Sequence, residues 1–368
     1  MKLQMARDEL LRGMGRVQAI VDRRGTLPIL TNALLEASEG SLKLAATDLE
    51  VGVTCHQPAQ IAAPGRVTIG AKKLYEIVRE LEDSEVQLEA RGDARVEITA
   101  GPARFSLLAI SPEEYPSLPS DDGVVFAQID GSLLADMIDR TLYATSTDET
   151  RYNLNGIFVE LTSEGRLCFV ATDGHRLAKV ERGTPQRLAV FQRSVIVPRK
   201  GVSEIRKLCD EGEGMVDIGL AEGFLLVRRP GLLLSCRLID SEYPAYRQVL
   251  PQNQQIRVNI ERERLLRAVR RVALVASDRA SGFAFALEDN ELQLSASNPD
   301  LGEAREHLAV DYPGARFQTR FDARYIADAL QSIPSKEVVL ELIDELSPAQ
   351  LRPADDPGQL AVVMPMRL

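Results

Sequence analysis

Three short segments of the chain share one pattern at a constant spacing, and this repeat constrains the fold more than any other feature. The segments are LKLAATD (42–48), LCFVATD (167–173) and LQLSASN (292–298), each displaced from the one before by 125 residues. Alternation of side-chain type along each segment is typical of a β-strand, and the closing Asp or Asn suits a turn. Turn residues also precede each segment in near-constant register: 38–40, 163–165 and 288–290. The sequence therefore predicts a threefold internal repeat.

The flanking segments repeat as well. Amphipathic helix candidates open the three units at 7–21, 132–144 and 261–275, and a strand followed by a second helix candidate lies at 67–81, 195–209 and 320–333. Two units end on similar proline-containing linkers, EEYPSLP (113–119) and SEYPAYRQVLP (241–251), where proline withdraws donors from any strand ladder. We expect an α+β fold of three repeated domains, 1–122, 123–251 and 252–368, each with two helices and antiparallel sheets.

Composition excludes several classes of protein. With 45% hydrophobic and 27% charged residues the chain is typical of a globular protein, and no apolar run reaches the roughly 18–20 residues that span a bilayer. The N-terminal segment has acidic residues and no apolar core, so we expect no signal peptide. Four cysteines without CxxC spacing and three distant histidines predict neither a metal site nor a disulfide framework. We expect a cytoplasmic protein without a membrane segment or a cofactor.

The net charge of −10 argues against nucleic acid unless the two signs are segregated. Basic residues recur on the predicted helices, and the densest group is ERERLLRAVRR (261–271) with five arginines. A solvated helix surface is the simpler interpretation for any single helix. Recurrence in all three units instead favours one shared positive surface, which suits a phosphate backbone contacted without regard to sequence. Because no aromatic stacking platform accompanies these bases, duplex is favoured over single-stranded nucleic acid.

The second copy of the repeated strand continues as Asp173-Gly174-His175, whereas Leu49 and Pro299 follow the corresponding Asp and Asn. Three interpretations are open: a structural turn, a binding site, or a hydrolase that uses Asp173 and His175 as an acid–base pair. Residues two apart in a turn need not face each other, and no nucleophile-elbow, zincin or phosphate-loop motif occurs. Catalysis is therefore the least favoured of the three.

The C-terminal segment VVMPMRL (362–368) cannot be a fully paired central strand, because Pro365 has no backbone donor. Methionine provides adaptable apolar surface for binding, so Met364 and Met366 suggest a contact site. A tail that fills the core is the alternative interpretation.

Five motifs together carry a resemblance to a known family. ATDGHRLA (171–178), RYNLNG (151–156), TLPILTN (26–32), VIVPRKG (195–201) and VVMPMRL resemble the bacterial DNA polymerase III β subunit family, the sliding clamps, and the similarity covers the whole chain. The resemblance implies a non-enzymatic replication processivity factor. In this family a head-to-tail homodimer forms a six-domain ring that encircles double-stranded DNA. Implied partners are the replicative polymerase α subunit, the clamp loader and other proteins with a clamp-binding motif.

The resemblance also implies three sets of site residues. Inner-surface bases that would face DNA are Arg24, Lys72, Lys73, Arg199 and Lys200, and the dimer contact would join Phe105 and Leu107 to Val275 and Ala276. Gln248 and Pro348 stand where the family has arginine and serine, so the hydrogen bonding around the groove differs here. The groove for a partner peptide would comprise Leu154, Thr172, Gly174, His175, Arg176, Leu177, Pro244, Val249, Leu346, Val362, Met364, Pro365 and Met366. Its apolar members would bury the partner's side chains, while His175 and Arg176 would shape a polar rim.

Overall fold

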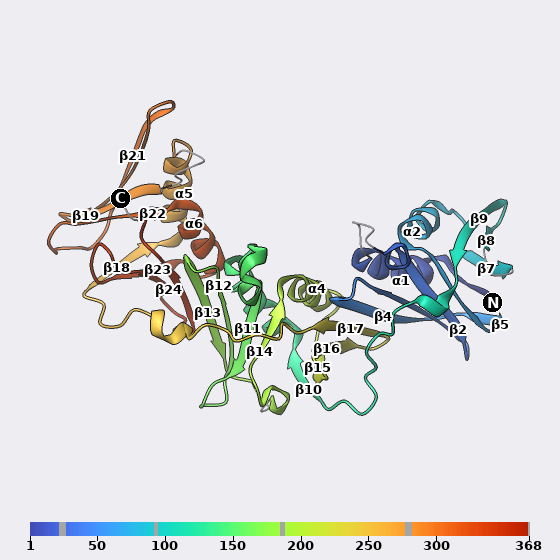
Figure 1. Ribbon diagram of the computed structural model, residues 1–368. Helices are drawn as coiled ribbons and strands as arrows, with labels where there is room; N and C mark the ends of the chain where they lie inside the picture. Colours follow the sequence, from blue (N-terminus) through green and yellow to red (C-terminus); the bar gives the residue numbers. More distant parts are fainter. Residues whose placement is uncertain (22–26, 92–94, 185–187, 277–281, 367–368) are drawn as a thin grey trace. The chain divides into compact units, whose positions relative to one another are not determined.

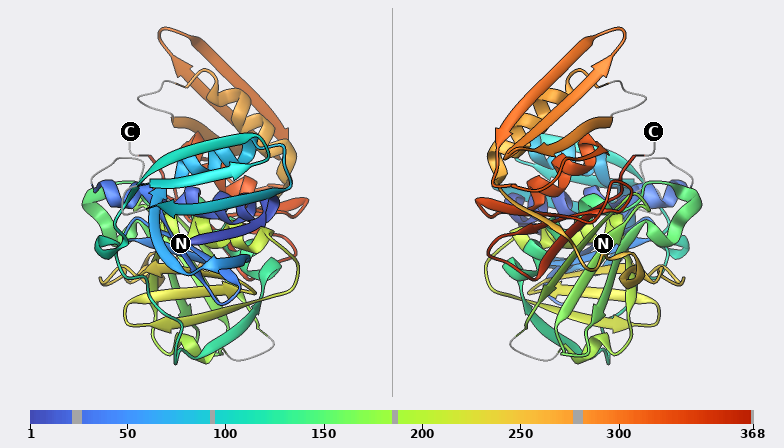
Figure 2. Two further views of the ribbon diagram at one scale, coloured as in Figure 1. Left: turned by 90° about the vertical axis from the view of Figure 1, so that its right-hand side faces the viewer. Right: turned by 90° about the vertical axis from the view of Figure 1, so that its left-hand side faces the viewer.

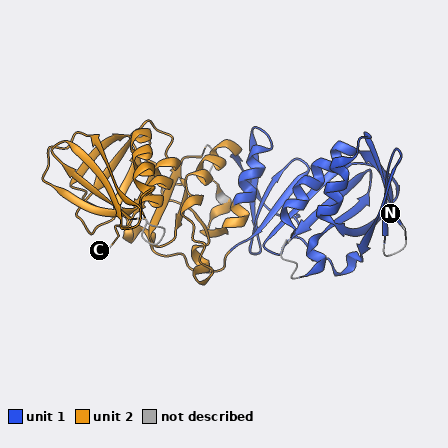
Figure 3. Cartoon of the chain, turned by 90° about the horizontal axis from the view of Figure 1, so that it is seen from above, with its two compact units in different colours: residues 1–130, 203–238 blue, residues 131–202, 239–368 orange. Residues whose placement is uncertain are grey.

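The computed structural model describes residues 1–21, 27–91, 95–184, 188–276 and 282–366. The chain forms two compact units, one from Met1–Asp130 with Ser203–Leu238 and the other from Gly131–Val202 with Ile239–Leu368 (Figure 3). None of the described helices is both long and apolar enough to cross a membrane.

The described residues contain six α-helices, two in each predicted repeat. They are α1 (Arg7–Ile20), α2 (Ala71–Glu80), α3 (Gly131–Asp139), α4 (Arg199–Asp210), α5 (Arg262–Ala273) and α6 (Ala323–Ser332). All six predicted helices are therefore confirmed. Only α3 ends well before its predicted limit, because the Thr141 hydroxyl donates to the carbonyl of Met137 and a separate 3-10 turn, η3 (Leu142–Ala144), follows.

The first unit is built on a 13-stranded antiparallel sheet with the order β10-β15-β16-β17-β4-β3-β2-β6-β9-β8-β7-β1-β5. Its core strands β4 and β17 lie side by side although about 180 residues of chain separate them, with Cys55 opposite Leu232 (Figure 1). The strands are β1 (Lys2–Ala6), β2 (Asn32–Ser38), β3 (Ser41–Thr47), β4 (Val51–Pro58), β5 (Gln60–Ala63), β6 (Gly65–Gly70), β7 (Glu85–Arg91), β8 (Arg95–Ala100), β9 (Ala103–Ile110), β10 (Phe126–Asp130), β15 (Met215–Ala221), β16 (Phe224–Arg229) and β17 (Leu232–Arg237).

The second unit holds an eight-stranded sheet, β14-β11-β12-β13-β25-β24-β23-β18, and a four-stranded sheet, β21-β20-β19-β22. The β20–β21 hairpin, orange in Figure 2, pairs along its whole length from Glu291 with Ala309 to Asn298 with Gly302. The strands are β11 (Gly156–Leu161), β12 (Leu167–Thr172), β13 (Arg176–Arg182), β14 (Val195–Pro198), β18 (Ile256–Glu261), β19 (Gly282–Glu288), β20 (Glu291–Asn298), β21 (Gly302–Ala309), β22 (Phe317–Asp322), β23 (Glu337–Leu342), β24 (Ala349–Pro353) and β25 (Gln359–Val363).

The three repeated segments are β3, β12 and β20, each the second strand of a hairpin. Alternate side chains on β3 point to opposite faces: Leu42 and Leu44 are fully buried, and a side chain at Gly13 of α1 would collide with Leu44. Lys43, between them, lies on the opposite face. Helix α1 therefore covers the face of this sheet that carries Leu42 and Leu44. We call the opposite face the outer face, and the first linker crosses it where Tyr115 packs on Ala45.

The turn after the repeated strand is shared by the first two repeats. Asp48 accepts hydrogen bonds from the backbone N–H groups of Glu50 and Val51, and Asp173 does the same for His175 and Arg176. The residues after the two aspartates, Leu49 and Gly174, have φ values of 78° and 87°. The first two repeats therefore share the backbone of this turn, and its side chains differ, as the sequence shows.

Replacing Leu49 by glycine should stabilise the protein. A left-handed conformation costs a residue with a side chain roughly 1–2 kcal/mol, and glycine avoids this cost. Part of the stabilisation is lost again, because glycine loses more backbone entropy on folding. We expect Leu49→Gly to raise the free energy of unfolding by about 0.5–1 kcal/mol, measured by urea denaturation. The matched control Gly174→Ala should lower it, and a destabilised Leu49→Gly protein would show that no strain resides at this turn.

Candidate functional site

A buried apolar cluster lies on the eight-stranded sheet of the second unit, and two of the predicted groove residues belong to it. Phe158, Tyr243 and Leu250 pack against its buried members, which are Cys168, Val170, Leu177, Tyr246, Leu360 and Val362. We call these nine residues the tail face, because strand β25 contributes to it. The predicted groove members Leu177 and Val362 are directly opposite each other in the β13–β25 ladder.

Two tyrosines fix the second linker to the tail face. The Tyr243 ring stacks on Phe158 at 4.8 Å between centroids, and its hydroxyl donates to the carbonyl of Val170 at 3.4 Å. The Tyr246 hydroxyl donates to Glu160 at 2.6 Å, and Arg247 donates to the same carboxylate. Burial raises the pKa of both tyrosine hydroxyls above the usual range, so they remain protonated donors at neutral pH.

The C-terminal tail divides into a buried and an exposed part. Val362 and Val363 are buried in β25, whereas Met364 and Met366 are exposed. Beyond the strand, the N–H of Met364 donates to the carbonyl of His175 at 2.9 Å, and that of Met366 donates to Arg320 at 2.8 Å. The valines of the tail therefore fill the core and its methionines reach the surface between β13 and β22, so the contact-site interpretation stays a prediction for the methionines.

Further apolar side chains are exposed near these elements. Leu346 is 81% exposed, and Val249 extends from the 3-10 turn η6 (Tyr246–Val249). The Asp344 carboxylate holds the turn that carries Leu346 by accepting from the N–H groups of Leu346 and Ser347. These hydrogen bonds hold the pKa of Asp344 below its usual range. Exposed apolar groups on fixed backbone are suited to contact with a partner.

Arg176 does not lie on an open rim. Its side chain is only 12% exposed and donates to Asp173 at 3.0 Å, to Asp328 at 2.6 Å and to the carbonyl of Tyr143 at 2.8 Å. Burial acts to lower its pKa, but the two carboxylates outweigh this effect and raise it. Arg176 therefore ties β13 to α6 and positions the turn rather than offering hydrogen bonds to a partner. His175 is exposed beside it and stacks on Tyr325.

The remaining predicted groove residues have different surroundings. Leu154 is buried at the end of the 3-10 helix η4 (Glu149–Leu154), where its carbonyl accepts from Ser146. Thr172 closes the turn by donating to the carbonyl of Arg176. Two other members, Gly174 and Pro244, are exposed, and Pro365 is half-buried. Of the two positions that depart from the family, Gln248 is exposed and Pro348 is half-buried.

The aromatic residues of the tail face were absent from the predicted groove. Tyr243 and Tyr246 occur in the linker SEYPAYRQVLP, so the repetition of a tyrosine before proline in both linkers was the available signal. No comparable pattern marks Phe158.

The acid–base interpretation lacks a free carboxylate. One oxygen of Asp173 accepts the two turn N–H groups and the other accepts the Arg176 side chain. Within the described residues, no group of three or more His, Cys, Asp or Glu side chains is placed to hold a metal ion. The turn is thus used structurally.

Strand β9, predicted to form a dimer contact, has an open edge. It pairs with β8 from Ala103 to Leu108, but in the part of the chain that the structure describes it pairs with β6 only at Ala109 and Ile110. Phe105 is exposed, Leu107 is half-buried, and Leu108, which was not predicted, is 71% exposed.

The other predicted dimer residues follow α5. Val275 and Ala276 are half-buried, and Ala276 packs against the core of the third repeat. The residue before them, Leu274, is 79% exposed. Leu274 was also missed, because apolar character in the sequence does not reveal which side of a helix end faces solvent.

Positive charge is concentrated on two of the helices. Helix α5 carries five arginines and one glutamate, and α4 carries four bases and two acids, although the whole chain has a net charge of −10. Lys72, Lys73 and Arg199 are exposed and Lys200 is half-buried at the first turns of α2 and α4, and Lys73 pairs with Glu76 at 2.6 Å. Arg24 lies outside the described residues.

Removing the Arg176 side chain should lower the free energy of unfolding by more than removing an exposed polar side chain does. Arg176→Ala leaves Asp173 and Asp328 without their shared cation, and we expect a loss of about 2–3 kcal/mol, since breaking a buried ion pair costs a few kcal/mol. Urea denaturation measures it. Arg151→Ala, which removes an exposed pair with Asp148 at 3.8 Å, is the matched control and should cost less than about 0.5 kcal/mol. Equal losses would contradict the positioning role.

Comparison with known proteins covers the whole chain. Models of the N-terminal, central and C-terminal domains of the DNA polymerase III beta subunit match residues 1–119, 128–245 and 247–367. The chain is 37% identical over 373 residues to the beta sliding clamp of Caulobacter vibrioides and 32% identical over 370 residues to that of Escherichia coli, with 100% of each chain covered.

Solved structures agree with these matches. The crystal structure of the DNA polymerase sliding clamp from Caulobacter crescentus superposes with a TM-score of 0.95 at 36% identity, over 100% of both chains. A Bartonella birtlesii sliding clamp bound to griselimycin gives a TM-score of 0.94 at 34% identity, again over 100% of both chains. The chain therefore belongs to the DNA polymerase III beta subunit family, the beta sliding clamps.

Proposed function

We propose that this protein is a replication processivity factor, a ring-shaped sliding clamp that encircles duplex DNA and tethers DNA polymerase. The observation that carries the proposal is the full-length family match combined with an assembled tail face on the second unit. The clamp performs no catalysis in this account. Its contribution to replication is to keep the polymerase attached.

The tail face is the proposed docking site for partner proteins. Its floor is apolar, and Val249, Leu346, Met364 and Met366 extend exposed apolar surface around the elements that build it. A short extended peptide with large apolar side chains would gain roughly 1.5–3 kcal/mol for each such side chain that it buries. The replicative polymerase α subunit, the clamp loader and other clamp-binding proteins would compete for this one site.

The ring is proposed to arise from two chains joined head to tail. The open edge of β9 exposes backbone groups beside Phe105 and Leu108, and a second copy would cover them with its third domain, where Leu274 is exposed. We propose three domains, 1–122, 123–251 and 252–368, so that the closed ring contains six.

DNA contact is proposed to come from the basic helices. Lys72, Lys73, Arg199 and Lys200, together with Arg24, would meet phosphates without reading base sequence. Several helix bases pair with carboxylates, such as Lys73 with Glu76, and such exposed pairs are weak enough for phosphate to displace. Contacts of this kind weaken with salt, so lasting attachment would come from closure around the duplex and the contacts would permit sliding.

Truncation of the tail tests the docking site. Deleting residues 364–368 removes both exposed methionines and the bond from Met364 to His175. We expect at least a tenfold loss of affinity for a fluorescein-labelled peptide from the clamp-binding motif of the replicative polymerase, measured by fluorescence anisotropy. Sedimentation should give the same mass for the truncated and full-length proteins, because the dimer contact lies elsewhere. Unchanged peptide affinity would place the docking site away from the tail.

A further inference from the structure

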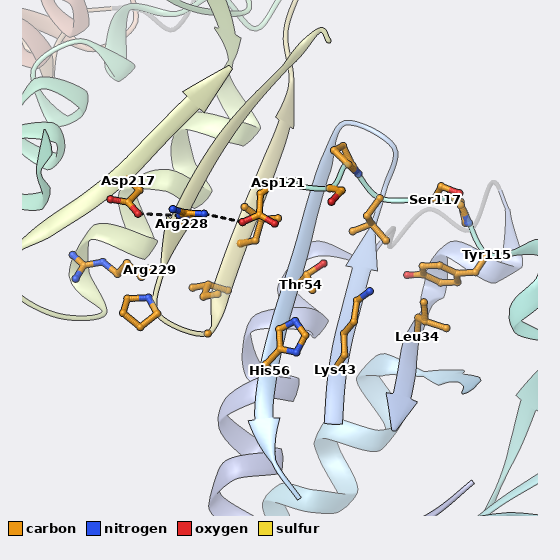
Figure 4. A pocket seen from close by; sticks show the side chains of 18 of the residues that line it. Leu34, Lys43, Thr54, His56, Tyr115, Ser117, Asp121, Asp217, Arg228 and Arg229 are labelled. Carbon is orange, nitrogen blue, oxygen red and sulfur yellow. Dashed lines mark hydrogen bonds and ion pairs between the residues drawn. The ribbon is translucent and has the colours of Figure 1, made fainter. Parts of the chain in front are cut away.

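The first unit contains a pocket of about 650 Å³ on the outer face of its sheet (Figure 4). Residues 115–121, which begin in the first linker and run just past it, form one wall. Side chains of β2, β3, β4, β6 and β16 and the turn at Pro230 form the others. This volume lies within the roughly 300–1,000 Å³ of typical ligand sites. The pocket is separate in sequence from every residue of the tail face.

The pocket and the tail face are built on the same plan. Tyr115 of the first linker donates to the carbonyl of Ala45, just as Tyr243 of the second linker donates to Val170, 125 residues later than Ala45. At the far end, the N–H of His56 donates to the carbonyl of Gly231.

The tail face has the counterpart of that bond, from the N–H of Glu181 to the carbonyl of Gly358. Strand β4 meets β17 as β13 meets β25. Each of the first two repeats therefore presents a linker laid across an equivalent sheet face.

The two faces differ in the size of the side chains beneath the linker. Ladder positions equate Leu34, opposite Ala45, with Phe158, opposite Val170. Three residues beyond the shared tyrosine, the first linker has Leu118 and the second has Tyr246. In the tail face the rings of Phe158, Tyr243 and Tyr246 fill this space, with centroids 4.8 and 6.2 Å apart. In the first unit Leu34 and Leu118 pack with Tyr115 as an apolar wall, and two leucines in place of two rings leave the pocket open beside this wall.

The charges also differ. Glu36 is the ladder equivalent of Glu160, since they lie opposite Lys43 and Cys168. Glu160 accepts hydrogen bonds from the side chains of Tyr246 and Arg247 in the second linker. At the position of Tyr246 the first linker has Leu118, whose side chain has no hydrogen-bond donor. Glu36 instead lies between two exposed bases, 3.5 Å from Lys43 and 4.0 Å from Arg66. One carboxylate shared by two bases leaves an excess of positive charge at this end.

The acids that line the pocket belong to a separate cluster, in which two carboxylates share one base and leave an excess of negative charge. Asp121 and Asp217 both pair with Arg228 at 2.9 Å, as the dashed lines in Figure 4 show. The side chain of Arg229 donates to three carbonyls at and beyond the end of α4. The imidazole of His56 lies beside Lys43 in Figure 4 and adds a further hydrogen-bonding group.

We propose that this pocket is a second peptide-docking site, which takes an extended segment of a partner protein carrying an aromatic side chain next to an acidic residue. The aromatic ring packs in the pocket against the apolar wall formed by Leu34, Tyr115 and Leu118, where the tail face carries its own rings. The acidic side chain pairs with Lys43 and Arg66. This proposal rests on the comparison of the two faces and is independent of the clamp function.

Methyl NMR on the full-length protein tests it, with the blocked tetrapeptide acetyl-Asp-Phe-Leu-Asp-amide as probe. We expect saturable shifts of the Leu34 methyl signals. Leu118→Tyr, which gives the first linker the ring of the second, should weaken binding at least tenfold, and so should the charge reversal Lys43→Glu with Arg66→Glu. Met364→Ala, in the C-terminal tail beside the tail face, is the matched control and should leave the affinity of the pocket for the tetrapeptide unchanged.

The peptide with asparagine in place of both aspartates should also bind at least tenfold more weakly. Three outcomes would overturn the proposal: no saturable shift in the wild type, shifts confined to Leu177 and Val362 of the tail face, or wild-type affinity in both pocket variants. Because the charge reversal changes exposed side chains only, it separates loss of binding from loss of folding if Leu118→Tyr fails to fold.

Discussion

Backbone pairing between different repeats is the interaction on which the rest of the structure depends. Strand β4 of the first repeat pairs with β17 of the second, and β13 of the second repeat pairs with β25 of the third. These ladders satisfy backbone groups that a separate domain would leave exposed at its sheet edge. They also set the register in which linker, sheet and turn meet, so the same construction arises once in each unit.

Equivalent scaffolds have then acquired different surfaces. Helix faces carry the bases, including five arginines on α5, while the chain as a whole is acidic. Under the second linker, aromatic rings fill the outer face and the tail adds exposed methionines; under the first, leucines leave a pocket. The Asp48 and Asp173 turns share one backbone, and only the second carries the Arg176 network. Function in this account resides in side chains placed on a repeated backbone.

The sequence was sufficient to predict the repeat, the α+β class and all six helices, because alternation and helical periodicity are local properties. It also located two of the nine tail-face residues, Leu177 on β13 and Val362 on β25. The role of Arg176 could not be predicted, since its partners Tyr143 and Asp328 lie far from it in the chain and only tertiary packing brings them together. Leu274 and Leu108 were missed for a related reason, because exposure at the end of a helix or the edge of a strand depends on neighbouring elements.

The ladders between repeats leave the β9 edge open from Ala103 to Leu108, and closure of that edge by a second copy is what would turn the chain into a ring. Attachment to DNA would then depend on topology and only weakly on the helix bases. Retention on DNA after loading by the clamp loader tests this claim most directly. At moderate salt, the protein should stay on a nicked circular duplex through gel filtration and be lost once that duplex is cut to a linear form. Equal retention on circular and linear DNA would contradict the account.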